Sequence, residues 1–435
     1  MATPTSTPPA DADAPDAAPA PDAPADAAAP AVDAPAGAPT PADADAPALD
    51  APEAAPTPDA PAAAPADDAA PAPDGTFAVG RLARYARIGE VTLDPRRNSL
   101  NLVRLVLALA VLVSHGWALM GYPEPRPGGE KVGTWAVFGF FALSGYLVTG
   151  SRLTSPLSAY AVRRITRIFP AFLVCLGVTA FGFAPVGYWV THRTLDGFFT
   201  TATTPVNYIL TNASLRIGAY DVAGTPAGVP FPGVWDGSLW SLYLEFGCYV
   251  LVAAVFSVVA LRRHAVATLG VGLVLAVVVH SRLPELARFT QDNSDLRLLV
   301  WLLPFFLAGG LVRVLEHRVV LTTPGAAACA LAMVGCAASG SDSGPQLAAP
   351  FIVYLLLWAG AILPCPAWVR RHDISYGAYI YAFPVQQMLL LVGATSWPLL
   401  AFDVAAVALT VPLAVASWFV VERPIMRRAR KITRR

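Results

Sequence analysis

The stretch VRLVLALAVLVSHGW, residues 103–117, is almost wholly apolar, yet it contains one arginine, Arg104, and one histidine, His115. Its apolar character predicts a membrane-crossing helix, for which about twenty residues span roughly 30 Å of hydrocarbon. In a helix, the eleven positions between the two side chains correspond to about 16 Å along the axis and only about 20° around it. We therefore expect Arg104 and His115 on one face of this helix.

Two interpretations are open for polar side chains on such a helix. Polar groups are costly to bury in lipid, so they normally line a cavity or meet polar partners in the bundle. Alternatively, Arg104 extends to the headgroups at the membrane surface and His115 bonds to a neighbouring helix. The helix alone does not decide between these interpretations.

The composition of the whole chain indicates a membrane protein. Of 435 residues, 55% are hydrophobic and 14% are charged, and the mean hydropathy of +0.53 is far above that of ordinary soluble domains. We predict an all-α polytopic membrane protein with about ten transmembrane helices. The approximate ranges are 101–120, 133–150, 169–190, 238–260, 265–281, 297–315, 321–340, 347–364, 374–393 and 398–420.

The N-terminal part of the chain has a different composition. Residues 1–75 consist mainly of Ala, Pro and Asp, and residues 1–74 carry fourteen acidic and no basic side chains. Such a segment cannot build a core, so we predict a disordered acidic tail. A basic juxtamembrane segment (76–98), the transmembrane domain (99–424) and a basic cytoplasmic tail (425–435) complete the expected organisation.

Arginine placement predicts the orientation, because basic residues stay preferentially on the cytoplasmic side of a membrane. Clusters occur at alternate loops, so we expect a multi-pass protein of the cell (plasma) membrane with both termini cytoplasmic. The long loop at 191–237 then lies outside, and its length is typical of a binding or lid role. The clusters are Arg81, Arg84, Arg87, Arg96 and Arg97; Arg152, Arg163, Arg164 and Arg167; Arg262 and Arg263; Arg313 and Arg318; Arg370 and Arg371; and the C-terminal RRARKITRR.

Other apolar segments carry polar groups at helical spacing. In WSLYLEFGCY, Ser241 and Glu245 are four positions apart and stack on one helix face. A carboxylate there is costly unless paired, and a basic group such as His115 or an arginine is the natural partner. In FGFFALSGYL, Ser144 and the following glycine allow close helix packing or support a site.

Arg164 and Arg167 in RRITRIFP are three positions apart, about one helical turn. Two guanidinium groups at this spacing can form a fork for a phosphate or a carboxylate. An arginine cluster at a membrane surface also serves simply as a topology anchor. Both readings stay open at this level.

Taken together, six motifs resemble the acyltransferase 3 family of membrane O-acyltransferases. They are the Arg104–His115 pair, FFALSGYL, RRITRIFPAF, WSLYLEFGCY, ISYGAYIYAFPV at 374–385 and VERPI at 421–425, in this order. The resemblance covers roughly residues 98–430. It implies a ten-helix domain that takes an acyl group from cytoplasmic acyl-CoA, with acetyl-CoA expected, and transfers it to a hydroxyl of a carbohydrate or glycoside acceptor.

The resemblance also implies roles for individual residues. His115 matches the essential histidine, which acts as general base or as a covalent acyl carrier. Glu245 matches the acidic position of the WS-L-E motif and would fix the histidine tautomer if it lies within reach. The acyl-donor binding arginines would be Arg104, Arg164 and Arg167. One position departs from the family pattern, because Ala382 stands where a second histidine often precedes Phe-Pro.

A secondary transporter is the alternative from another class, since buried charges and prolines within helices also fit one. It predicts an internal repeat, and the charged positions 104, 115 and 245 have no counterparts in the second half. No residue cluster has metal-ligand spacing, and no glycine-rich nucleotide loop follows a strand. We therefore expect no metal, no bound cofactor and no nucleic-acid partner; oligomeric state and acceptor identity stay open.

Overall fold

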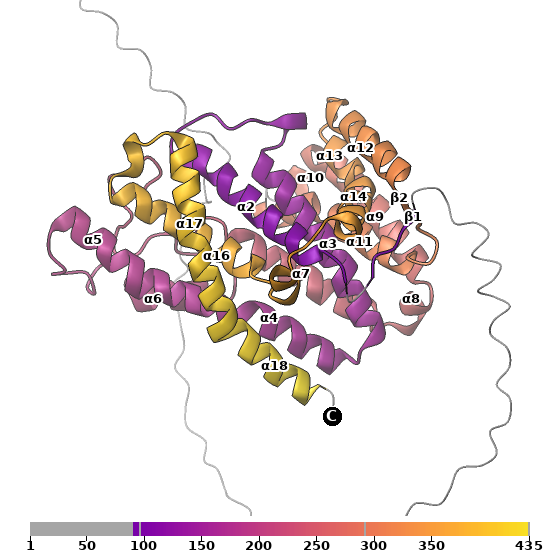
Figure 1. The fold of residues 1–435 in the computed structure, drawn as a ribbon, viewed down its shortest axis with the longest axis horizontal. Coiled ribbons are helices and arrows are strands. Elements are labelled where there is room, and N and C mark those ends of the chain that lie inside the picture. Colours follow the sequence, from indigo (N-terminus) through magenta and orange to yellow (C-terminus); the bar gives the residue numbers. More distant parts are fainter. Residues whose placement is uncertain (1–89, 95–96, 291–292, 434–435) are drawn as a thin grey trace, which may run out of the picture. The chain divides into compact units, whose positions relative to one another are not determined.

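The computed structural model describes residues 90–94, 97–290 and 293–433, and within these ranges the chain is almost wholly helical (Figure 1). The strands of the described part are β1 (Glu90–Val91) and β2 (Leu321–Thr322), which pair antiparallel. The predicted acidic tail, 1–75, and most of the predicted segment 76–98 lie outside the described residues. The structure confirms the expectation of a mainly helical protein.

Each of the ten predicted apolar segments falls on a helix. Five helical stretches of the described chain are long and apolar enough to cross a membrane: α2 (Leu100–Leu119), α3 (Val132–Thr154), Leu157–His192, α11 (Ser294–Val314) and Leu399–Ile432. Four others are apolar but have only 10–17 residues: α7 (Trp240–Val255), α9 (Ala265–Ser281), α12 (Thr323–Ala338) and α14 (Ala349–Ile362). The tenth is α16 (Ser375–Leu391). These helices indicate a multi-pass membrane protein, while ten crossings stay a prediction.

Two of the long stretches extend well beyond their predicted ranges. The predicted apolar ranges 169–190 and 398–420 lie within longer helical stretches, whose arginine-rich parts fall outside an apolar window. The first stretch consists of α4 (Leu157–Val178), the π-helical η4 (Thr179–Phe183) and α5 (Ala184–His192). The second consists of α17 (Leu399–Ser417), the π-helical η6 (Trp418–Glu422) and α18 (Arg423–Ile432).

Short helices and turns connect these elements. They are η3 (Pro127–Gly129), α6 (Pro205–Asn212), α8 (Val259–Arg263), α10 (Leu283–Thr290), α13 (Gly344–Leu347), α15 (Ala367–Arg371) and η5 (Ala394–Ser396). Of these, α6 lies within the long loop between α5 and α7, and α15 directly precedes the segment that leads into α16.

Helices α3 and α11 approach each other backbone to backbone. A Cβ atom added to Gly145 would overlap the carbonyl oxygen of Phe306, and one added to Gly309 would overlap the carbonyl oxygen of Ala142. Small residues permit this approach, which is typical of helix pairs in membranes. The glycine after Ser144 thus serves helix packing, as its position in the sequence suggested.

Helix α2 packs against α3, α14, α16 and α17 (Figure 1). Its contact with α16 includes a hydrogen bond from Gln386 Nε2 to the carbonyl oxygen of Leu112, at 2.9 Å. Because α2 runs without interruption from Leu100 to Leu119, Arg104 lies near its first turn and His115 near its last. The two side chains therefore belong to opposite ends of the bundle.

The long loop between α5 and α7 folds back onto the bundle. Gln387 of α16 donates hydrogen bonds to the carbonyl oxygens of Phe231 and Val234, at 2.7 and 2.8 Å. Asp236, which is 1% exposed, accepts a hydrogen bond from the hydroxyl of Tyr208 at 2.5 Å. These bonds fix the end of the loop where it enters α7.

Candidate active site

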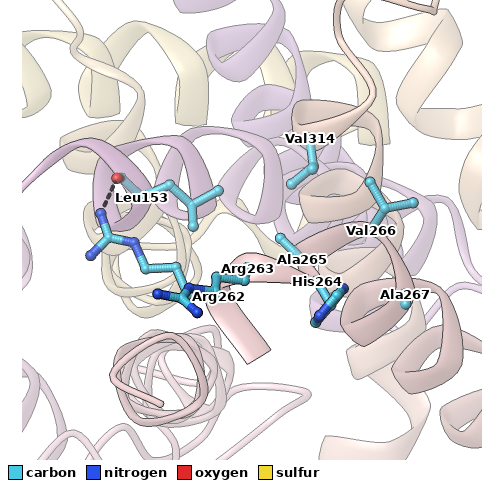
Figure 2. A pocket seen from close by; sticks show the side chains of 8 residues that line it. All are labelled: Leu153, Arg262, Arg263, His264, Ala265, Val266, Ala267 and Val314. Carbon is cyan, nitrogen blue, oxygen red and sulfur yellow. Dashed lines mark hydrogen bonds between the residues drawn. The ribbon is translucent and has the colours of Figure 1, made fainter. Parts of the chain in front are cut away.

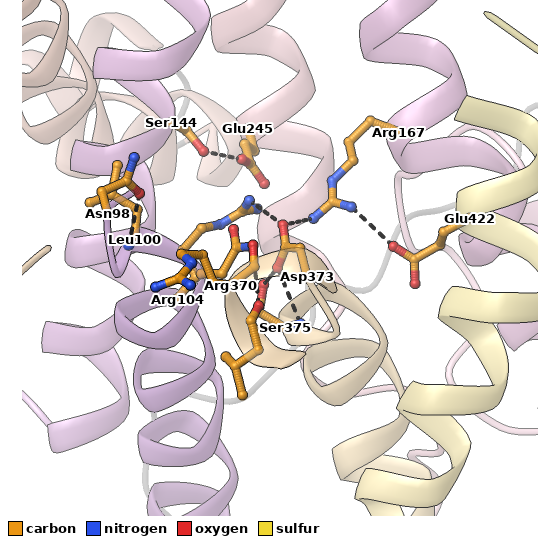
Figure 3. A network of polar contacts seen from close by, with 12 residues as sticks. Asn98, Leu100, Arg104, Ser144, Arg167, Glu245, Arg370, Asp373, Ser375 and Glu422 are labelled. Carbon is orange, nitrogen blue, oxygen red and sulfur yellow. Dashed lines mark hydrogen bonds and ion pairs between the residues drawn. The ribbon is translucent and has the colours of Figure 1, made fainter. Parts of the chain in front are cut away.

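Four charged side chains form a network at the Arg104 end of α2 (Figure 3). The Asp373 Oδ2 atom accepts hydrogen bonds from Arg104, at 2.6 Å, and from Arg167, at 2.7 Å. Arg167 also contacts Glu422 at 3.1 Å. The four come from α2, α4, the segment before α16 and η6, so the network ties together regions that are far apart in the sequence.

Asp373 is held from several sides. Ser375 donates to its Oδ1 atom from the hydroxyl, at 2.5 Å, and from the backbone nitrogen, at 3.3 Å. Burial alone would raise the pKa of the Asp373 carboxyl, but Arg104 and Arg167 outweigh it and lower that pKa to about 2. The carboxylate is therefore ionised over the whole physiological range.

These ion pairs bear on the predicted donor-binding arginines. In this structure the guanidinium groups of Arg104 and Arg167 bind protein carboxylates, so their binding of a phosphate stays a prediction. Arg164 differs, since no described carboxylate contacts it: it lies over the rings of Tyr160 and Tyr249, at 5.9 and 5.8 Å from the centroids, and its Nε atom is buried without a partner. Arg164 and Arg167 therefore contact different neighbours in this structure, and a fork for a phosphate stays a prediction.

Glu245 is satisfied by hydroxyl groups. Its Oε1 atom accepts hydrogen bonds from Ser144, at 2.5 Å, and from Tyr249, at 2.6 Å. The expected pairing with His115 or an arginine is not among its bonds in the described structure. The contact nevertheless brings together the predicted residues Ser144 and Glu245, from α3 and α7.

Ser241 belongs to a second hydroxyl chain on α7. The hydroxyl of Tyr379 donates to the carbonyl oxygen of Ser238 at 2.6 Å, so its oxygen is left to accept from Ser241, also at 2.6 Å. Arg104, Ser241 and Glu245 line one small cavity of about 30 Å³, together with Val137, Phe140, Phe141, Leu242, Ser375, Tyr376 and Tyr379. That space is sufficient for a water molecule. Three of the predicted residues therefore do meet.

His115 lies outside this cavity. Its ring packs edge-on against the ring of Phe383 on α16, with centroids 5.2 Å apart, and its Nδ1 atom is buried without a hydrogen-bond partner. Phe383 also contacts the long loop, since its ring lies 6.2 Å from that of Phe231 and within 2.6 Å of a Cβ atom built on Gly237. The structure thus places the loop before α7 beside the histidine, with Ala382 adding no polar group there.

The structure also draws attention to Asp403, a residue that the sequence analysis missed. Asp403 lies on α17, is 7% exposed and has a buried Oδ1 atom without a partner. A Cβ atom on Gly116, the residue after His115, would collide with this carboxylate. The signal in the sequence was a single acidic residue within the apolar run LLAFDVAAVALT, 399–410, which normally marks a functional position in a membrane protein.

A larger cavity, of about 570 Å³, lies elsewhere (Figure 2). Its lining consists of Leu153, Arg262, Arg263, His264, Ala265, Val266, Ala267 and Val314, and Arg262 donates to the carbonyl oxygen of Leu153 at 2.6 Å. None of the predicted site residues lines it. Within the described chain, no group of three or more His, Cys, Asp or Glu side chains could hold a metal ion, and all five cysteines are free.

Comparison with known proteins identifies the class. The chain is 30% identical over 309 residues to a protein of Shigella phage Sf6 named O-acetyl transferase. The alignment covers 68% of this chain and 86% of that protein. It is also 30% identical over 362 residues to Nodulation protein 10 of Rhizobium leguminosarum bv. viciae, covering 76% of this chain and 94% of that protein. No solved structure matches.

The sequence profile of the acyltransferase 3 family, described as an acyltransferase domain, matches residues 97–419. The protein is therefore an acyltransferase of the membrane, and it belongs to the acyltransferase 3 family. The resemblance inferred from the six motifs is confirmed, and membership implies an acyl donor as co-substrate. Both the Arg104 network and the surroundings of His115 lie almost wholly within the matched range, with Glu422 three residues beyond it.

Proposed function

We propose that this enzyme moves an acetyl group from cytoplasmic acetyl-CoA to a hydroxyl of a carbohydrate or glycoside, with His115 acting on that hydroxyl. The observation that carries the proposal is the His115 imidazole, which lies on a membrane helix of an acyltransferase domain with its Nδ1 atom buried and unpartnered. The relative named O-acetyl transferase supports acetyl as the group that is transferred.

The chemistry follows from the properties of an imidazole. A neutral imidazole accepts the proton of the acceptor hydroxyl while the oxygen attacks the thioester carbonyl. The C–O bond forms, the C–S bond breaks, and the CoA thiolate receives the proton from the imidazolium. In the covalent alternative, His115 is acylated first and the hydroxyl then attacks the acyl-imidazole. Either route gives an ester and free CoA.

The arginine end of α2 is the proposed binding region for the CoA phosphates. Arg164 has no carboxylate partner among the described residues, so its charge is available for an anion. A phosphate that reaches Arg104 and Arg167 must compete with Asp373 for them. Since the helix rises about 1.5 Å per residue, His115 lies about 16 Å further along α2, which the pantetheine arm has to bridge.

The proposed orientation puts these arginines on the cytoplasmic side, where acetyl-CoA is found. Arg104, Arg167 and the basic helix α18 then lie at the cytoplasmic face of the plasma membrane, with both chain termini on that side. The loop before α7 lies at the outer face beside His115. Acceptor hydroxyls thus approach from the side opposite to the donor.

The experiment compares cell-envelope glycans and extractable glycosides by mass spectrometry, in cells with and without the gene. We expect a mass difference of one acetyl unit in one fraction. Reintroducing the full chain should restore it, whereas His115→Ala should lower transfer by about 10² to 10⁴-fold, as for the loss of a general base.

The matched control is His280→Ala, because His280 is also a membrane-helix histidine but bonds to Ser343, at 3.0 Å. We expect this variant to retain transfer. Full activity of His115→Ala, with normal membrane insertion, would refute the role of His115. No mass difference in any fraction would instead refute acyl transfer to a glycan and favour a transporter.

A further inference from the structure

Two buried polar atoms without partners belong to residues of α2 and α17, two helices that pack against each other. One is the Nδ1 atom of His115, and the other is the Oδ1 atom of Asp403. Buried polar groups in folded proteins are hydrogen-bonded in the large majority of cases, so each exception calls for an explanation. The two atoms have complementary chemistry, a ring nitrogen and a carboxylate oxygen. Asp403 meets Gly116, the residue that follows His115, and this neighbourhood suggests a common explanation.

Gly116 fixes how closely the two helices approach. A Cβ atom added to this residue would collide with the Asp403 Oδ1 atom, so the carboxylate occupies the space that a side chain would need. Adjacent Cα atoms are about 3.8 Å apart, and the carboxylate therefore lies about one side-chain length from the His115 backbone.

Other groups nearby do not account for Asp403. On α16, the helix that packs against both α2 and α17, Phe383 offers the His115 ring an apolar face. Gln386 uses its amide nitrogen on the carbonyl oxygen of Leu112, and its own oxygen is unpartnered. A buried acidic residue on a membrane helix is costly, and such residues are normally kept for function.

We infer that Asp403 is the positioning residue for His115: its carboxylate accepts a hydrogen bond from the Nδ1–H group of the imidazole. This inference rests on the proposed function of His115. It gives Asp403 the orienting role that the sequence motif had suggested for Glu245, whose Oε1 atom is occupied by Ser144 and Tyr249. The two side chains are not bonded in this structure, and such bonds often tighten only when substrate is present.

The bond determines which nitrogen does the chemistry. With the proton fixed on Nδ1, the Nε2 atom is free to accept the proton of the acceptor hydroxyl as the C–O bond forms. The imidazolium that results is stabilised by the carboxylate, as in hydrolase triads. The proton then passes from Nε2 to the thiolate released when the C–S bond breaks, and Asp403 stays ionised throughout.

The test uses membranes containing the full chain, with [¹⁴C]acetyl-CoA as the probe and incorporation of label into endogenous acceptor as the readout. Asp403→Asn keeps the shape of the side chain and removes its charge. We expect kcat to fall by about 100-fold, within the range for loss of base function, with little change in the KM for acetyl-CoA. Asp403→Glu restores the carboxylate and should recover part of the lost rate.

A purely structural role makes the opposite predictions. The isosteric asparagine would then keep activity, while the longer glutamate would lose it through crowding against Gly116. Thermal stability separates the two roles further, because removal of an unpaired buried charge should leave the melting temperature of Asp403→Asn unchanged or raised. A lowered melting temperature with an unchanged kcat would overturn the inference.

Glu124→Gln is the matched control, since Glu124 bonds to Ser114, the residue before His115. This variant also replaces a carboxylate by an amide, and its kcat should stay within about twofold of the wild-type value. That change is far smaller than the loss expected when a base is removed. Inactive His115→Ala together with fully active Asp403→Asn would refute only the positioning role. Activity in both variants would refute the proposed function of His115 itself.

Discussion

Asp373→Asn tests the charged network most directly. The folded protein lowers the pKa of the Asp373 carboxyl from 3.8 to about 2. At 1.36 kcal/mol for each tenfold change in proton affinity, this difference corresponds to about 2.5 kcal/mol of unfolding free energy at neutral pH. Because the pKa is lower in the folded state, this contribution is fully present above about pH 4. It is lost as the pH falls from about 4 through 2.

The measurement is thermal unfolding of the detergent-solubilised protein, followed by the fluorescence of its ten tryptophans, between pH 7 and pH 2. The wild type should lose stability steeply below about pH 4. Asp373→Asn should be less stable by about 2.5 kcal/mol at pH 7 and should lack that part of the acid dependence.

The control is Asp295→Asn, which removes the exposed ion pair between Arg216 and Asp295, with side chains 54% and 38% exposed. Exposed pairs contribute under about 1 kcal/mol, so this variant should unfold almost like the wild type. If Asp373→Asn has wild-type stability at pH 7 and the same acid dependence, the network does not hold the bundle together as inferred.

Two further predictions concern the loop and the helix packing. Burial raises the pKa of Asp236 to about 7, which the hydrogen bond from Tyr208 only partly offsets. This contribution to stability should be complete below about pH 4 and lost as the pH rises to about 7. Asp236→Asn should therefore remove most of the change in melting temperature between about pH 4 and pH 7. A wild-type melting temperature that is constant over this pH range would contradict the assignment. Gly145→Ala should destabilise the α3–α11 contact by about 1–3 kcal/mol or prevent folding, because its Cβ atom overlaps the backbone of Phe306. Gly270→Ala is the control and should be tolerated, because no atom lies within 4 Å of its added Cβ. The two variants are compared by size-exclusion chromatography. Identical profiles would argue against the close approach of α3 and α11.

Hydropathy predicts the positions of the helices because the membrane imposes one simple condition, a run of apolar residues of sufficient length. Each predicted segment falls on a helix for this reason. The same rule does not predict where the helices Leu157–His192 and Leu399–Ile432 end. There, arginines continue the helix, and one of them, Arg167, contacts the carboxylates of Asp373 and Glu422.

The partners of the charged residues follow from tertiary structure and could not be predicted. Arg104 and Asp373 are 269 positions apart, and Arg167 and Glu422 are 255 positions apart. The sequence indicates that a buried charge needs a partner, but it contains no periodicity that selects one. Glu245 illustrates the limit, since the structure gives it hydroxyl donors where a basic partner was expected.

The π-helical turn η6, Trp418–Glu422, has a consequence for the comparison of relatives. Such a turn contains one residue more than an α-helical turn. Deleting one residue here would restore a regular α-helical turn and leave the residues of α18 on nearly the same faces, because the wider turn absorbs the extra residue. The contact of α18 with α4 would then keep the same residues. In an alignment, a single-residue gap at this turn is therefore compatible with C-terminal helices that present the same face to α4.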